Sequence, residues 1–201
     1  MDADPERLRT TAAADRRRYG PSVTPAPTRY VALLRGINLG KARQVDMTRL
    51  RDLLTARDHG EVRTHLRSGN VVLDSALSEA ELAADLSAAI GEEFGFDVPV
   101  VVRSGTELAA VVAGDPFATV ATDPARYLVT FMAEMPDPAG VDALPQAESG
   151  DYLVRGRELY LWLPDGITNT PLGSWDWDKL LGVPGTARNW RTVTKLAELS
   201  A

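Results

Sequence analysis

Two short polar stretches of the sequence combine residue types that bind anions. The first runs from Arg35 to Lys41 and the second from Arg67 to Asn70. They contribute guanidinium, amide, hydroxyl and ammonium groups, and their glycines let the backbone approach a ligand closely. The Gly-x-x-x-x-Gly-Lys-Ser/Thr spacing of a P-loop is absent. The candidate ligand-binding side chains here are Arg35, Asn38, Lys41, Arg67, Ser68 and Asn70. The alternative is that the glycines only supply positive φ and the asparagines bond their own turns.

A third polar group lies near the C-terminus, where Arg188, Asn189 and Lys195 follow Thr186. Thr186 is a typical N-cap, so the pattern predicts a helix over residues 187–199. Arginine binds phosphate and carboxylate groups through paired hydrogen bonds. Arg188, Asn189 and Lys195 are therefore further candidates for ligand binding. The alternative is an ordinary solvated helix face.

No set of residues has the spacing of a known catalytic device. His59 and His65 lack metal-ligand spacing, and Asp176 and Asp178 are explained more simply by the dipole of a helix that starts there. The chain contains no cysteine, which excludes disulfides, zinc–thiolate sites and a thiol nucleophile. We expect neither a metal nor a cofactor, and whether the protein is an enzyme stays open.

Aromatic residues suggest a second class of function. Tyr160 and Trp162 alternate on an expected strand, and RNA-binding sheets stack bases on aromatic side chains spaced in this way. A formal charge of −6 argues against binding nucleic acid by bulk electrostatics. Nucleic acid is therefore an alternative partner, and burial of both side chains would remove it.

The elements that position the first two polar stretches form a recognisable unit over residues 29–104. A strand apolar on both faces starts at Tyr30, and a helix capped by Asp46 follows it. A hairpin turns at residues 68–70, a helix begins at the capping box of Ser78 and Glu81, and a last strand covers residues 98–102. This order predicts a ferredoxin-like βαββαβ unit in an α+β protein, with both polar stretches at one edge of its sheet.

The second half, residues 105–201, reads as a degenerate relative of the first. A short helix runs to Ala113, and a strand over residues 128–133 shares the Arg-Tyr opening of the first strand. A second hairpin has arms at 151–155 and 158–163, and helices are expected over residues 174–181 and 187–199. Residues 1–28 are rich in arginine and proline and are expected to form a flexible extension.

Composition indicates a soluble globular protein, because 44% of its residues are hydrophobic and 25% are charged. No apolar run is long enough for a membrane helix, and the N-terminus lacks the layout of a secretory signal. We expect a cytoplasmic protein without a membrane partner, and the sequence leaves its oligomeric state open.

Four segments resemble domain-of-unknown-function family 1697, a widespread bacterial group. They are Tyr30–Asn38, Arg67–Val72, Pro116–Phe117 and Thr186–Leu196. The resemblance spans residues 30–199 and implies no catalytic residue. It groups the matching polar positions: Arg35, Asn38, Ser68, Asn70, Arg188, Asn189 and Lys195.

The sequence thus predicts an anion-binding pocket where the first loop, the first hairpin and the last helix meet. A nucleotide or a phosphorylated metabolite would suit such a pocket. The alternatives are a nucleic-acid-binding module and a protein-interaction module without a small ligand.

Overall fold

The computed structural model describes residues 26–201. Of the extension expected over residues 1–28, residues 1–25 lie outside the described part of the chain. The first strand begins at Thr28. None of the helices in the described part of the chain combines the length and the apolar character needed to cross a membrane.

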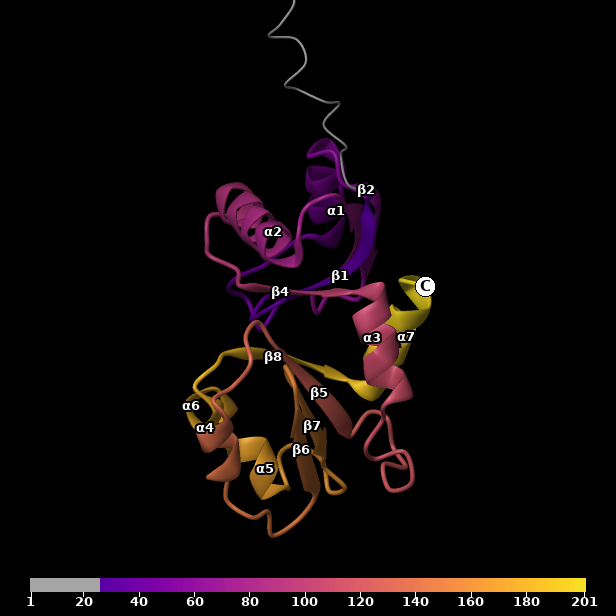
Figure 1. Cartoon of the computed structure of the whole chain (residues 1–201). Coiled ribbons are helices and arrows are strands. Elements are labelled where there is room, and N and C mark those ends of the chain that lie inside the picture. The colour runs from indigo at the N-terminus through magenta and orange to yellow at the C-terminus, as the bar shows by residue number, and fades with distance from the viewer. Residues whose placement is uncertain (1–25) are drawn as a thin grey trace, which may run out of the picture.

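The first half forms a four-stranded antiparallel sheet covered by two helices (Figure 1). Its strands lie in the order β2-β3-β1-β4, which confirms the ferredoxin-like prediction. The bounds are β1 Thr28–Leu34, α1 Met47–Ala56, β2 Gly60–His65, β3 Asn70–Ser75, α2 Glu79–Phe94 and β4 Val100–Ser104. The expected helix starts are present, because Asp46 accepts a hydrogen bond from the Arg49 amide and Ser78 forms a capping box with Glu81.

The second half repeats this topology. Its strands lie in the order β6-β7-β5-β8, which is the same permutation of the chain order. The bounds are α3 Gly105–Ala113, β5 Tyr127–Met132, α4 Pro138–Asp142, β6 Asp151–Arg155, β7 Glu158–Trp162, α5 Pro171–Ser174, α6 Trp177–Leu181, β8 Gly185–Asn189 and α7 Trp190–Leu199. The chain is therefore an α+β protein with two related halves, and a helix follows the fourth strand of each sheet: α3 follows β4, and α7 follows β8.

The expected start of the last helix is wrong. Gly185–Asn189 forms β8, which pairs with β5, and α7 starts at Trp190. Asn189, rather than Thr186, is the N-cap, and its Oδ1 accepts from the Thr192 amide at 2.9 Å. A short polar strand has no local hydrophobic signature, and only the open edge of β5 selects it.

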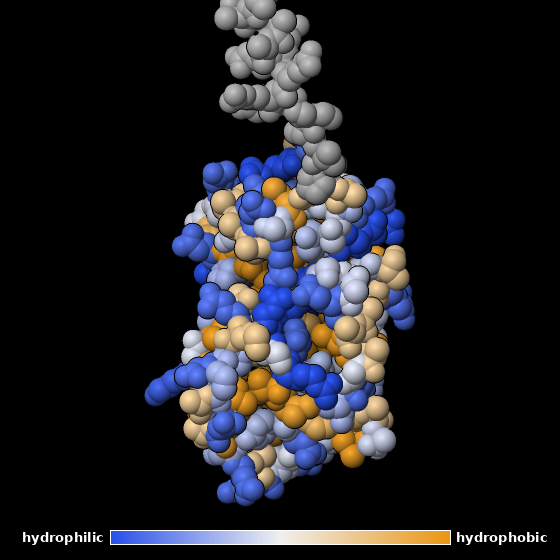
Figure 2. Space-filling model, viewed as in Figure 1, coloured by the Kyte–Doolittle hydropathy of each residue, from blue (hydrophilic) through white to orange (hydrophobic). Residues whose placement is uncertain are grey.

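Three hydrophobic clusters fill the spaces between sheets and helices, and the layers that they join are seen in Figure 1. One fills the space between the first sheet and α1 and α2, and another lies between the second sheet and α4–α6. The central cluster joins the facing sides of both sheets with α3 and α7, which pack against each other. Figure 2 shows hydrophilic residues gathered around the middle of one face, where the two halves meet.

The strand registers define which residues of the two halves are equivalent. When the ends of β1 and β5 are aligned, Val31 corresponds to Val129, and both belong to the central cluster. Val31 lies opposite Arg103 in β4, and Val129 lies opposite Arg188 in β8. Arg103 and Arg188 are thus equivalent, and each immediately precedes the N-cap of the following helix.

The shared Arg-Tyr opening of the two first strands does not mark equivalent positions. Tyr30 belongs to the cluster under α1 and α2, whereas Tyr127 faces the central cluster. Adjacent residues of a strand point to opposite faces, so aligning the two tyrosines would invert every side chain of the strand.

Candidate anion-binding site

A cleft of about 590 Å³ opens at the edge where β1 ends. It is lined by residues 34–39, 67–68 and 185–188. The end of β1 and the β2–β3 turn meet there, as the antiparallel pairing of β1 with β3 requires, and the third wall is β8 rather than the last helix. The lining contains three arginines and no acidic residue.

Arg188 is buried beside this cleft and donates only to neutral oxygen atoms. Its Nε–H donates to Asn70 Oδ1 at 2.5 Å. Its Nη1 donates to Thr186 Oγ1 and to the Ala187 carbonyl, both at 2.8 Å. Its Nη2 donates to the carbonyls of Leu34, Ser68 and Gly69 at 2.7, 3.2 and 3.1 Å.

The charge of Arg188 has no counter-charge in the structure. Its guanidinium contacts no carboxylate of residues 26–201, and burial alone lowers its pKa to about 10. The side chain therefore stays charged at neutral pH. A buried cation held only by neutral dipoles leaves a positive potential at the wall of the cleft.

The two asparagines of the predicted site have structural roles. Asn38 donates to the carbonyls of Val45 and Arg67 at 3.1 and 2.7 Å and accepts from the Val45 amide at 2.9 Å, which closes the loop after β1. Asn70 is fully buried, donates to the His65 carbonyl at 2.7 Å and holds Arg188. Each asparagine therefore bonds its own loop, as the alternative predicts, and each also bonds a distant segment, because Asn38 donates to the Arg67 carbonyl and Asn70 accepts from Arg188.

Arg35 lines the cleft but is paired. Its guanidinium forms an ion pair with Asp178, whose other oxygen accepts from the Gly185 amide at 3.0 Å. The sequence predicts Asp178 as a residue of a helix start, which it is, but carries no signal for its place beside Arg35. The tertiary fold brings it there, because α6 leads directly into β8.

The remaining hydrogen-bond donors of the cleft belong to the β1 loop and the β2–β3 turn. Arg67 is exposed, and its guanidinium donates to Gln44 Oε1 at 3.3 Å. The Ser68 hydroxyl accepts from Asn70 at 3.2 Å. Within residues 26–201, the amides of Gly36 and Ile37 contact no acceptor.

Three predicted residues do not reach the cleft. Lys41 is exposed on the β1 loop and does not line it. Asn189 caps α7, and Lys195 lies on the exposed face of α7 with an ion pair to Glu198 at 2.9 Å. The helical spacing that grouped Arg188 with Lys195 does not apply, because Arg188 belongs to a strand.

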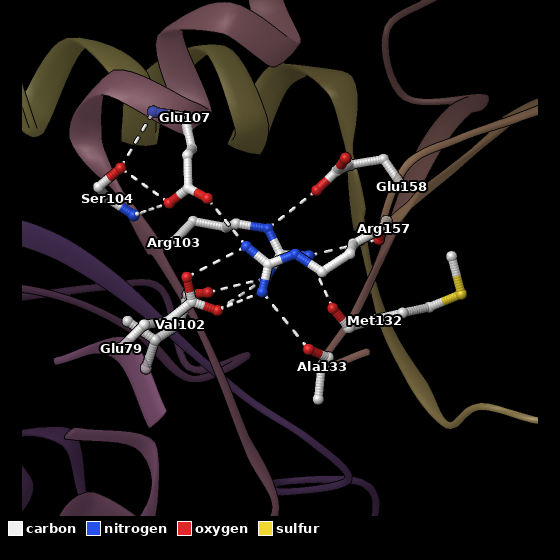
Figure 3. Close-up of polar contacts among 9 residues, drawn as sticks. All are labelled: Glu79, Val102, Arg103, Ser104, Glu107, Met132, Ala133, Arg157 and Glu158. Carbon is white, nitrogen blue, oxygen red and sulfur yellow. Dashed lines mark hydrogen bonds and ion pairs between the residues drawn. The ribbon is translucent and has the colours of Figure 1, made fainter. Parts of the chain in front are cut away.

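The equivalent arginine of the first half has acidic partners (Figure 3). Arg103 is buried, and its Nε–H donates to Glu158 Oε1 at 2.8 Å. Its Nη2 donates to the carbonyl of Met132, the residue equivalent to Leu34, at 2.7 Å. Glu79 lies 3.6 Å from its Nη1.

Glu158 occupies the position equivalent to Asn70. It lies opposite Phe131 in β5, as Asn70 lies opposite Leu33 in β1. The same network contains Arg157, which forms an ion pair with Glu79 and donates to Glu107 at 2.8 Å. Each half therefore holds the other half's arginine at the start of its third strand, with a carboxylate in one case and an amide in the other.

The strand aromatics are core residues. Tyr160 and Trp162 are 2% and 8% exposed and belong to the central cluster. Burial raises the pKa of Tyr160 to about 12, so its hydroxyl stays protonated. These two side chains offer no surface for base stacking, which removes the observation behind the nucleic-acid alternative.

The two histidines lie outside the cleft lining. His59 is buried, and its Nε2 lies 3.1 Å from Asp85 Oδ2, while Arg57 donates to the same carboxylate at 2.6 Å. His65 ends β2, and its carbonyl accepts from Asn70. The described residues contain no group of three or more histidine, cysteine, aspartate or glutamate side chains placed to hold a metal ion.

Fold and site together define a duplicated ferredoxin-like α+β protein with a cationic cleft where its halves meet. Residues 28–160 match the family described as "Protein of unknown function (DUF1697)", and the chain belongs to that family. A conserved bacterial protein from Streptococcus pneumoniae has a similar structure, with a TM-score of 0.72 and 24% identity over 88% of this chain and 100% of that chain. At that identity the likeness concerns the fold alone. No curated protein matches.

Proposed function

We propose that the protein binds a small organic anion, such as a nucleotide or another phosphorylated metabolite, in the cleft between its two halves. The observation that supports this function is the difference between two equivalent arginines. Arg103 is neutralised by Glu158, whereas Arg188 meets Asn70 at the same position. An anion in the cleft would supply the charge that Glu158 supplies in the other half.

The ligand would not need to displace the hydrogen bonds of Arg188. Those bonds hold the guanidinium in place, and its field acts across the cleft wall. Direct contacts would come from Arg67, the Ser68 hydroxyl and the amides of Gly36 and Ile37. A cleft of about 590 Å³ lies within the range of small-molecule sites.

A thermal-shift screen with inorganic phosphate, AMP and sugar phosphates tests this function. A ligand of the native state at about 100 times its Kd adds about 2.7 kcal/mol, which raises the Tm by several degrees. Asn70→Asp should abolish the shift, because it places a carboxylate against Arg188 as Glu158 is placed against Arg103. This variant loses the amide bond to the His65 carbonyl, so its Tm without ligand is measured first.

Glu158→Gln is the matched control. It replaces a carboxylate by an amide at the equivalent position of the second half, away from the cleft. The ligand-induced shift should therefore stay intact. Absence of any shift in the wild type would contradict the proposed function. An equal shift in wild type and Asn70→Asp would show that the anion does not depend on the charge of Arg188.

A further inference from the structure

We propose that the anion carries an apolar group, which binds against Leu39 at the rim of the cleft while the charged end lies near Arg67 and Arg188. This inference rests on the proposed function and specifies its ligand. It follows from three properties of the cleft: an exposed leucine, a loop that holds it in place, and aliphatic walls.

Leu39 is 76% exposed, more than any other large hydrophobic residue in the described part of the chain, and it lines the cleft. An isolated exposed leucine needs no explanation. This one lines a site in which a cation, Arg67, is also exposed. An apolar group beside an anionic one would contact both side chains.

The loop that carries Leu39 is held by several hydrogen bonds. Asn38 bonds both Val45 and Arg67, and Arg43 donates to the carbonyls of Gly36 and Asp97 at 3.0 and 2.6 Å. The Arg43 guanidinium also lies over the Phe96 ring, 5.1 Å from its centroid. Leu39 is thus presented to solvent by an ordered loop, and a ligand would not bear the cost of ordering it.

Other residues of the lining continue the apolar surface: Leu34 and Ile37 are buried, and Ala187 is exposed. Leu34, Ile37 and Ala187 line the cleft, and no aromatic side chain does. A phosphate group fills only a small part of about 590 Å³. The rest of the ligand would therefore contact aliphatic side chains, which hold an apolar body by burial of its surface rather than by base stacking.

Isothermal titration with two matched pairs of probes tests this inference. Phenyl phosphate is compared with methyl phosphate, and benzoate with acetate, so that the pairs separate a phosphate head from a carboxylate head. We expect the aromatic member of the better-bound pair to bind about tenfold more tightly, because its extra apolar surface is buried. Leu39→Ser should remove most of that preference.

Leu66→Ser is the matched control. Leu66 is 55% exposed on the neighbouring β2–β3 turn but does not line the cleft, so its variant should keep the preference. Both leucines are exposed, and neither change should disturb the fold. Equal binding of both members of each pair, or an unchanged preference in Leu39→Ser, would contradict the proposed contact with Leu39. Neither result would contradict the proposed anion site. If none of the four probes bound while AMP or a sugar phosphate still raised the Tm, the apolar contact would be overturned and the proposed function would not; the proposed function fails only when the thermal-shift screen also gives no shift.

Discussion

Asn70 and Glu158 begin the third strands of their halves, and each meets the arginine of the opposite half. A carboxylate at Glu158 lets Arg103 be buried with a counter-charge, which favours a closed polar network. The amide of Asn70 accepts a hydrogen bond from Arg188 but does not compensate its charge. The two halves therefore differ at this position by one buried carboxylate, which is present beside Arg103 and absent beside Arg188.

Gly69 sets how closely the β2–β3 turn approaches β1. Its φ is +83°, and an added Cβ would lie 2.7 Å from Ile37 Cδ1 and 2.8 Å from Leu34 Cβ. Gly69→Ala should lower the free energy of unfolding by about 2–4 kcal/mol, combining a strained φ with overpacking. Urea unfolding measures the change. Gly36→Ala, at φ +67° with open space around it, should cost only about 1 kcal/mol; equal costs would contradict the steric explanation.

Asp85 makes the stability of the first half depend on pH. Its hydrogen bond from Arg57, and a further one with His59, lower its pKa. A carboxyl whose folded pKa is below its unfolded pKa stabilises the fold above the unfolded value, about 4, and this contribution is lost as the pH falls through the folded pKa. Asp85→Asn should therefore lower the urea midpoint at pH 7 more than at pH 3. Parallel losses at both values would contradict this role.

At the scale of elements, the junction between β8 and α7 decides where Arg188 points. A strand that ends at Asn189 directs Arg188 toward the first half, whereas a helix over the same residues would have placed it beside Lys195. The equivalent junction between β4 and α3 uses Ser104 as the cap and directs Arg103 toward the second half. The same strand-to-helix junction therefore builds both arginine contacts.

Asn189→Ala should lower the free energy of unfolding by about 1 kcal/mol, because the Asn189 side chain accepts from the Thr192 amide at the start of α7. Asn189→Ser should recover most of this loss, since serine is also a good N-cap. Chemical denaturation of the two variants gives the comparison. A serine variant as unstable as the alanine variant would indicate that capping is not the role of Asn189.

For the whole molecule, the central cluster makes each half depend on the other. Val31, Leu33, Val72 and Val101 of the first sheet pack with residues of the second sheet and with α3 and α7. The ion pair between Glu79 in α2 and Arg157 after β6 joins the halves again at the surface. The division of the chain at residue 104 stays a prediction. Because the two halves share the central cluster, we expect them to unfold together.

Leu33→Ala tests that coupling. Leu33 is fully buried in the central cluster, so its truncation should cost about 2–5 kcal/mol. All four tryptophans lie between residues 162 and 190, in the second half. Their fluorescence midpoint in urea should fall together with the far-UV circular dichroism midpoint. A fluorescence midpoint unchanged by this first-half substitution would contradict cooperative unfolding.

The sequence by itself determined the elements whose signals are local. The apolar run of β1, the capping box of Ser78 and Glu81 and the turn at Gly69 each depend on neighbours in the chain, and they were sufficient for the ferredoxin-like unit. Chain connectivity also predicted that the β1 loop and the β2–β3 turn would meet. These features follow from short-range propensities and from the few topologies that a βαββαβ order allows.

Only the tertiary structure decided the features that depend on distant partners. β8 forms because β5 offers an open edge, and Asp178 becomes the partner of Arg35 because α6 precedes that strand. Whether the charge of Arg188 is compensated depends on whether a carboxylate or an amide lies opposite it, 118 residues away in the chain. Electrostatic pairing in a low-dielectric interior is set by three-dimensional proximity, and no periodicity along the sequence records it.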